Sequence, residues 1–146
     1  MKLLIVDDHM IIRRGLVQLL VGHARVESIH EAADAPSALQ ELRSNHFDVV
    51  FLDIELGDRD GLDLLRTIRR EFPSSGVIML SVYPESQFGV RAIKSGASAY
   101  LNKGCSPDEL YAALARVACG GIYITPCIAE LLARNVRGEG AAVPHE

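Results

Sequence analysis

The chain has 146 residues, of which 49% are hydrophobic, 23% charged and 5% aromatic, and its formal net charge is −4. These values are typical of one globular domain with a single core, and they exclude disorder over most of the chain. No apolar run reaches the roughly 18 to 20 residues of a membrane span, and the one after Lys2 is too short for a signal peptide. We therefore expect a cytoplasmic protein without a membrane segment.

The charged and thiol residues exclude two further classes. No Lys/Arg run exceeds the pairs Arg13-Arg14 and Arg69-Arg70, so the basic surface of a nucleic-acid-binding protein is missing. Cys105, Cys119 and Cys127 form neither a CxxC pair nor a metal-ligand spacing. We expect reduced, mostly buried thiols.

Short apolar runs alternate with segments of helical period along the chain. Each run is bounded by polar, Gly or Pro residues and predicts a strand: Leu3–Val6, Val26–Ile29, Val49–Leu52, Val77–Leu80 and Ala99–Leu101. Caps at Asp34, Ser106 and Thr125 support the helix starts. The alternation predicts an α/β fold of the doubly wound class, a five-stranded parallel sheet with helices on both faces.

The chain continues beyond this pattern. After Gly120-Gly121, we expect a helix near Pro126–Asn135, with Ile128, Leu131 and Leu132 on one side. Gly138–Glu146 is predicted to be a flexible linker.

Reactive side chains follow four of the predicted strands directly. Asp7 and Asp8 follow the first strand, and the others stand after the third, fourth and fifth: Asp53, Ser81 and Lys103. In an open parallel sheet ligands bind beyond the carboxyl ends of the strands, so these five residues are expected to share one crevice.

The chemistry of these residues suits phosphate. Three clustered carboxylates repel each other unless a divalent cation neutralises them, and oxygen ligands with room for water and phosphate favour Mg²⁺. A carboxylate can attack phosphorus, while the Lys103 ammonium and the Ser81 hydroxyl could hold phosphoryl oxygens. Taken singly, each residue is better explained without a ligand: Asp7-Asp8 by the helix dipole, Asp53 by a turn, Ser81 by a cap and Lys103 by solvation. The prediction rests on their joint occurrence at equivalent strand ends.

The residues around these positions resemble the receiver domains of bacterial two-component response regulators. The resemblance covers about residues 1–119 and rests on four motifs: Val6-Asp7-Asp8-His9, Leu52-Asp53 with Gly61 eight residues after the aspartate, Leu80-Ser81-Val82, and Gly96-Ala97-Ser98-Ala99-Tyr100-Leu101-Asn102-Lys103. It implies a flavodoxin-like sheet with strand order 2-1-3-4-5.

The resemblance also implies the roles of individual residues. Asp53 would receive a phosphoryl group from a sensor histidine kinase. Mg²⁺ would be held by Asp8, Asp53 and the backbone carbonyl of Glu55, with Asp7 acting through water. Ser81 and Tyr100 would form a switch pair, although Tyr100 could also be plain core. Such a domain is a switch that catalyses only its own phosphorylation and dephosphorylation, and a homodimer is implied.

Two departures from the family pattern concern loops. Leu56-Gly57 replaces the common Met-Pro, which leaves the stiffness of that loop open. The acidic run Glu55, Asp58 and Asp60 lacks the spacing of a calcium loop, so we expect a solvated loop there. Gly104, where many receivers have proline, indicates the NarL/FixJ subfamily, which carries a LuxR-type output domain.

Three other sites with basic side chains are expected to have structural roles. His9 is expected to pack at the helix entry, because imidazole is a poor ligand for Mg²⁺. Arg13-Arg14 and Arg69-Arg70 are expected to be solvated helix faces, with kinase docking as the alternative.

We expect residues 1–119 to be the receiver, 120–137 a linker strand and helix, and 138–146 a flexible linker. A helix-turn-helix domain downstream of this chain would then supply DNA binding. Two alternatives remain: a Mg²⁺-dependent phosphohydrolase with an aspartyl-phosphate intermediate, and a single-domain receiver acting by protein contact or dimerisation. The adjacent Asp7-Asp8, in place of an Asp-x-Asp motif, speaks against the first.

Overall fold

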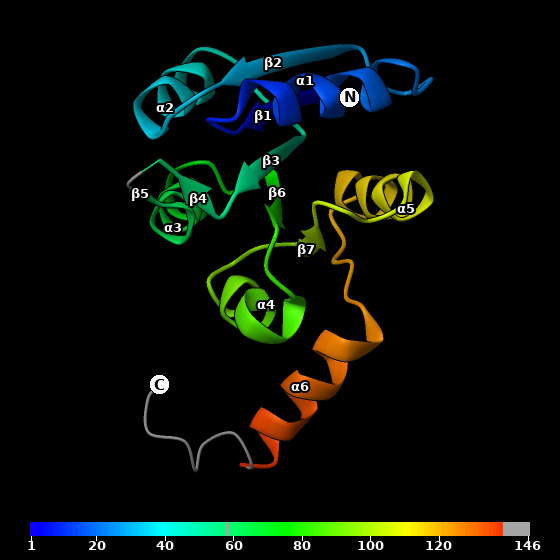
Figure 1. Ribbon diagram of the computed structural model, residues 1–146. Helices are drawn as coiled ribbons and strands as arrows, with labels where there is room; N and C mark the ends of the chain where they lie inside the picture. Colours follow the sequence, from blue (N-terminus) through cyan, green and yellow to red (C-terminus); the bar gives the residue numbers. More distant parts are fainter. Residues whose placement is uncertain (58, 139–146) are drawn as a thin grey trace.

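The computed structural model describes residues 1–57 and 59–138 and contains the predicted parallel sheet (Figure 1). Its spatial order is β2 (Ser28–Ala32), β1 (Lys2–Val6), β3 (Val49–Asp53), β6 (Gly76–Ser81) and β7 (Ala99–Asn102). Counted along the chain among these five strands, the order is 2-1-3-4-5, as the resemblance implied. The central strand β3 is buried throughout, which explains its continuous apolar sequence.

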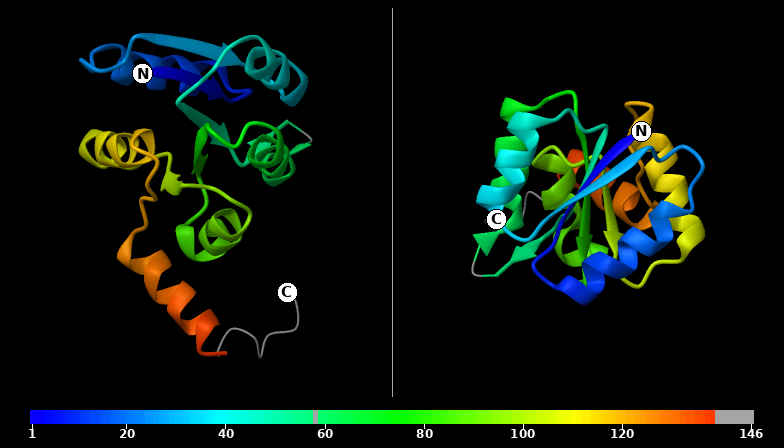
Figure 2. Two further views of the ribbon diagram at one scale, coloured as in Figure 1. Left: turned by 180° about the vertical axis from the view of Figure 1, so that it is seen from behind. Right: turned by 90° about the horizontal axis from the view of Figure 1, so that it is seen from above.

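The helices cover both faces of the sheet, as Figure 2 shows in its view from above. On one face, α1 (Met10–Val21) and α5 (Pro107–Ala118) bury their apolar sides in a shared core cluster. On the other face lie α2 (Ala35–Ser44), α3 (Gly61–Glu71) and α4 (Glu85–Lys94). Within the described residues, no helix is long and apolar enough to span a membrane.

The predicted caps are confirmed, and one strand begins later than predicted. The side chains of Asp34, Ser106 and Thr125 each accept the backbone N–H three residues on. The second strand begins at Ser28 rather than Val26, because Val26 N–H closes a turn onto the His23 carbonyl. As an edge strand, β2 is only partly buried and carries a weak apolar signal.

The segment after Asp53 forms a structure that was not predicted. The acidic residues Glu55 and Asp60 are exposed to solvent as expected, but they lie in paired strands: β4 (Glu55–Leu56) pairs antiparallel with β5 (Arg59–Asp60), and Leu56 is buried. Gly57 turns the chain with φ 61°, a conformation that proline cannot adopt. The glycine that departs from the family pattern therefore permits this hairpin. Asp58 lies outside the described residues.

The last helix, α6 (Pro126–Val136), packs against α4 (Figure 1). Ile128 is fully buried in the same core cluster as α2, α3 and α4. A Cβ atom on Gly89 of α4 would lie 2.8 Å from Ile128 Cδ1, so this glycine makes the close approach possible. The segment beyond residue 119 therefore packs on the domain. Of the predicted linker at residues 138–146, all but Gly138 lies outside the described part of the chain.

The expectation of mostly buried thiols is wrong. Cys119 and Cys127 are exposed and Cys105 is half-buried; all three are free. Cys119 is the C-cap of α5 and Cys127 lies in the first turn of α6, and side chains at helix ends reach solvent readily.

Candidate functional site

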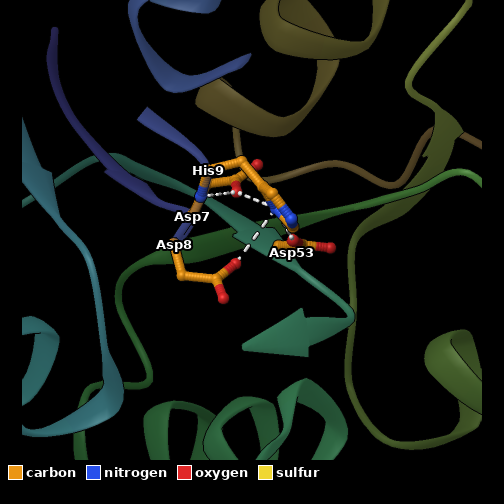
Figure 3. Close-up of side chains that lie close together, drawn as sticks. All are labelled: Asp7, Asp8, His9 and Asp53. Carbon is orange, nitrogen blue, oxygen red and sulfur yellow. Dashed lines mark hydrogen bonds and ion pairs between the residues drawn. The ribbon is translucent and has the colours of Figure 1, made fainter. Parts of the chain in front are cut away.

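The acidic pair lies at the carboxyl end of β1. Asp7 continues the sheet, since its N–H donates to the Ala32 carbonyl at 3.1 Å, and its side chain is buried. One of its carboxylate oxygens accepts the His9 N–H at 2.8 Å, which fixes the turn into α1. The Asp8 side chain is 30% exposed, and its carboxylate points toward the His9 imidazole (Figure 3).

Asp53 lies beside this pair, at the end of β3, and is 3% exposed. Lys103 Nζ is 3.0 Å from Asp53 Oδ2 and 3.0 Å from Asp7 Oδ2, so one ammonium forms ion pairs with two buried carboxylates. The other oxygen of Asp53 accepts the Glu55 N–H at 3.1 Å. Four predicted residues, Asp7, Asp8, Asp53 and Lys103, are therefore brought together.

Burial and neighbouring charges shift the pKa values of Asp53 and Lys103. Burial raises the pKa of Asp53, and the Asp7 charge adds to this, while the Glu55 N–H and Lys103 act in the opposite direction. Burial alone would lower the pKa of Lys103, but the nearby negative charges of Asp53 and Asp7 raise it. The ammonium therefore stays charged at neutral pH.

The donor set fits a hard divalent cation. Ligand atoms of Asp7, Asp8, His9 and Asp53 lie within 4.8 Å of one another. Asp7 Oδ2 is buried and, within the described residues, accepts no hydrogen bond; the Lys103 ammonium contacts it only as an ion pair. Three carboxylates against one ammonium leave an excess of negative charge that a cation would balance.

The expectation that His9 packs at the helix entry is wrong. Its side chain is 61% exposed, and its Nδ1 lies 3.1 Å from Asp8 Oδ1, 3.3 Å from Asp7 Oδ1 and 3.9 Å from Asp53 Oδ2 (Figure 3). Excess carboxylate charge attracts the imidazole more strongly than the apolar surface does. Because the ring is exposed, it could turn away from a cation held by oxygen atoms.

Ser81 and Tyr100 are both buried next to this cluster, and Tyr83 connects them. Tyr83 N–H donates to Ser81 Oγ at 2.9 Å, and the Tyr83 carbonyl accepts the Tyr100 hydroxyl at 3.0 Å. The Tyr83 hydroxyl donates to Glu55 Oε2 at 3.0 Å, and this bond raises the pKa of Tyr83. Burial raises the pKa of Tyr100. Through three separate polar groups, Tyr83 is thus bonded to Ser81, to Tyr100 and to Glu55.

A close backbone approach holds the segment directly after Asp53. Gly61 N–H donates to the Ile54 carbonyl at 2.7 Å, and a Cβ on Gly61 would lie 2.3 Å from the Asp53 carbonyl oxygen. Only glycine fits there. Gly61 is one of the residues on which the family resemblance rests, and this close contact explains why a glycine is needed at this position.

Comparison with known proteins identifies the family. The family model for the response regulator receiver domain matches residues 3–115 of this chain. This chain belongs to the response regulator receiver domains. Two relatives that resemble this receiver are the transcriptional regulatory protein UhpA of Escherichia coli, 39% identical over 129 residues, and the response regulator UvrY of Escherichia coli, 33% identical over 132 residues. The matches cover 88% and 90% of this chain but only 64% and 61% of those proteins.

Solved structures agree with the fold. A LuxR-family response regulator from Aurantimonas sp. superposes with a TM-score of 0.82 at 30% identity, covering 92% of this receiver and 96% of that chain. The isolated receiver of RcsB from Salmonella enterica, in the presence of the phosphomimetic BeF₃⁻, gives 0.79 at 25% identity, with 90% and 97% covered. These relatives support the NarL/FixJ subfamily.

Sequence reasoning missed two residues of this receiver. Tyr83 was overlooked, although its position two residues after Ser81 could have indicated it. Arg13 was expected on a solvated face, but its side chain is only 15% exposed and reaches the acidic loop. The expectation is also wrong for Arg69, whose guanidinium donates to the Ser75 carbonyl at 2.9 Å. Arg14 and Arg70 are exposed as expected.

Proposed function

We propose that this receiver stores a signal as an aspartyl phosphate on Asp53, taken from the phosphohistidine of a sensor histidine kinase. The observation that carries the proposal is the position of Asp53. It is the buried carboxylate that shares the Lys103 ammonium with Asp7 and also faces the exposed side of the cluster through Asp8 and His9. Burial keeps bulk water away, while the crevice leaves an approach for a phosphoryl donor.

In the proposed transfer, a carboxylate oxygen of Asp53 forms a bond to phosphorus as the bond from phosphorus to the histidine nitrogen breaks. The electron pair of that bond leaves with the imidazole. Lys103 would neutralise charge on the phosphoryl oxygens, and the Ser81 hydroxyl would donate to one of them. The chain does no turnover chemistry on other substrates in this account.

The carboxylates would hold Mg²⁺. Asp8, Asp53 and the backbone carbonyl of Glu55 are the proposed ligands, and Asp7 would act through water. Bound there, Mg²⁺ supplies charge neutralisation of the phosphoryl group. We expect weak Mg²⁺ binding without phosphate. Asp8→Ala should weaken it without destabilising the apo protein, because like-charge repulsion is relieved at the same time; calorimetry and thermal unfolding measure the two effects.

Phosphorylation would then be read through Ser81. If the Ser81 hydroxyl turns toward the phosphoryl group, its bond from Tyr83 N–H is released, and Tyr83 is also the partner of Tyr100 and Glu55. The segment from Ser81 to Tyr100 includes α4, against which α6 packs. Tyr100 is already buried in this structure, so the proposed change involves its hydrogen-bond partner more than its burial.

The output is proposed to lie outside this chain. The matches cover less than two thirds of UhpA and UvrY, and UhpA is called a transcriptional regulatory protein. We infer a downstream LuxR-type helix-turn-helix domain that binds DNA, and a homodimer. The cytoplasmic location stays a prediction.

The proposal is tested by incubation with Mg²⁺ and acetyl phosphate followed by intact mass measurement. One phosphoryl group should be added to the wild type and none to Asp53→Asn. Full labelling of Asp53→Asn would contradict the assignment. Release of phosphate far beyond one equivalent per protein would instead support a phosphohydrolase.

A further inference from the structure

Two adjacent arginines on α1 share one partner but differ in what else they contact. Arg13 Nε lies 2.9 Å from Glu31 Oε1, and Arg14 Nη1 lies 2.6 Å from Glu31 Oε2. Arg13 also donates through Nη1 to the backbone carbonyl of Asp7. The Arg14 side chain is 58% exposed, against 15% for Arg13. Arg13 alone therefore links α1 and β2 to the acidic loop.

The Asp7 carbonyl is a sensitive point of contact. It belongs to the planar peptide unit that joins Asp7 to Asp8, so its direction sets where the Asp8 backbone and side chain point. On its other side, Asp7 is already fixed by its N–H bond to Ala32 and by the buried contact with Lys103. The direction of the Asp7–Asp8 peptide is then held from two sides, by the Arg13 guanidinium on its carbonyl and by the turn that the His9 N–H closes onto Asp7 Oδ1.

Asp8 depends on this backbone for its position. Within residues 1–57 and 59–138, the only ion-pair partner of its carboxylate is the exposed His9, 3.1 Å away. Asp7 and Asp53, by contrast, are buried and share Lys103. A tilt of the Asp7–Asp8 peptide would therefore move the Asp8 carboxylate with little resistance from its side-chain surroundings.

We propose that Arg13 is a positioning residue that orients Asp8 for Mg²⁺, with Glu31 holding the guanidinium in place. This proposal rests on the proposed function, which makes Asp8 a Mg²⁺ ligand. Groups that orient a metal ligand typically change metal affinity by about 10- to 100-fold when they are removed.

The sign of the effect separates positioning from charge. Removing a positive charge near an acidic site should tighten cation binding, whereas disorienting a ligand should weaken it. Glu31 already neutralises much of the guanidinium charge, so the orienting effect should dominate for Arg13. Arg14 carries the same charge and the same Glu31 contact without touching Asp7, which makes it a matched control.

The test compares Arg13→Gln with Arg14→Gln in the full chain. Calorimetry with Mg²⁺ alone should show at least about 10-fold weaker binding for Arg13→Gln and unchanged or slightly tighter binding for Arg14→Gln. The amide resonance of Asp8, recorded without metal, should shift in Arg13→Gln and stay in place in Arg14→Gln. Thermal unfolding without Mg²⁺ controls for loss of fold.

Two further variants keep the test decisive if Arg13→Gln does not fold. Arg13→Lys retains the positive charge but cannot donate to Glu31 and to the Asp7 carbonyl from two separate nitrogen atoms, so it should lose Mg²⁺ affinity. Glu31→Gln should give a smaller loss of Mg²⁺ affinity. Mg²⁺ affinity equal to that of the wild type in these folded variants, or tighter binding in Arg13→Gln, would overturn the proposal. Absence of phosphorylation in the wild type would contradict the proposed function and leave these Mg²⁺ measurements interpretable.

Discussion

Two groups of side chains at the same end of the sheet are held in different ways. Asp7, Asp53 and Lys103 are buried charges, each with a partner of opposite sign 3.0 Å away. Ser81, Tyr83 and Tyr100 are joined by hydrogen bonds between uncharged groups. Removing one member of a buried ion pair is costly, whereas a neutral hydrogen bond contributes about 1 kcal/mol and can be exchanged. The first group is suited to chemistry and the second to switching.

Lys103→Met should give the largest effect, because it leaves two buried carboxylates without their shared cation. We expect a loss of stability on the order of 3 kcal/mol without metal and a greater gain in thermal stability from Mg²⁺ than in the wild type. Lys94→Met is the control, since the Lys94 ammonium donates to Asn135 Oδ1 at the surface and its removal should change stability by less than about 0.5 kcal/mol. Equal urea midpoints for the two variants would show that the charged group is not held by Lys103.

Gly61→Ala tests the backbone that presents Asp53. The added Cβ meets the Asp53 carbonyl, which cannot move as a flexible side chain would, so we expect a loss of about 1 to 3 kcal/mol and slower phosphorylation. Gly15→Ala, in α1 with nothing within 4 Å of its Cβ, should instead stabilise by about 0.5 to 1 kcal/mol. Urea unfolding measures both, and a stable, fully active Gly61→Ala would contradict the account.

Tyr100→Phe tests the second group, the hydrogen-bonded Ser81, Tyr83 and Tyr100. The variant loses the hydroxyl bond to the Tyr83 carbonyl, at a cost of about 1 kcal/mol, while phosphorylation by acetyl phosphate should stay near the wild-type rate. Loss of phosphorylation in this variant would mean that the two groups are not separable.

The dependence of stability on pH tests the charged group more finely. Burial raises the folded-state pKa of Asp53, so the folded protein binds its proton more tightly than the unfolded chain does. Its contribution to stability is therefore present below the unfolded pKa of about 3.9 and is lost as pH rises through the higher folded pKa. Asp53→Asn should flatten this decline in thermal-unfolding series without metal. An unchanged slope would show that Asp53 has no raised pKa.

The strand ends could be predicted from sequence because their signal is local. Each reactive residue directly follows an apolar run, and parallel topology alone brings Asp7, Asp53 and Lys103 together. The long-range contacts could not be predicted in this way. Arg13 pairs with Glu31, eighteen residues away, and nothing in the local pattern of α1 indicates that partner.

The hairpin after Asp53 is a second feature that could not be predicted from the sequence. The chain turns at Gly57 with a positive φ, which the glycine permits but does not demand. The acidic composition predicted solvent exposure, and Glu55 and Asp60 are exposed, with the buried Leu56 beside them. Composition could not predict the pairing of two strands this short, because two residues are too few to show a strand period.

The central claim is that Asp53 alone carries the phosphoryl group. Borohydride reduction of the protein after incubation with Mg²⁺ and acetyl phosphate converts an acyl phosphate to homoserine, and peptide mass mapping then locates it. The account predicts homoserine at position 53 and unmodified aspartate at positions 7 and 8. Homoserine at Asp7 or Asp8 with an intact Asp53 would contradict it.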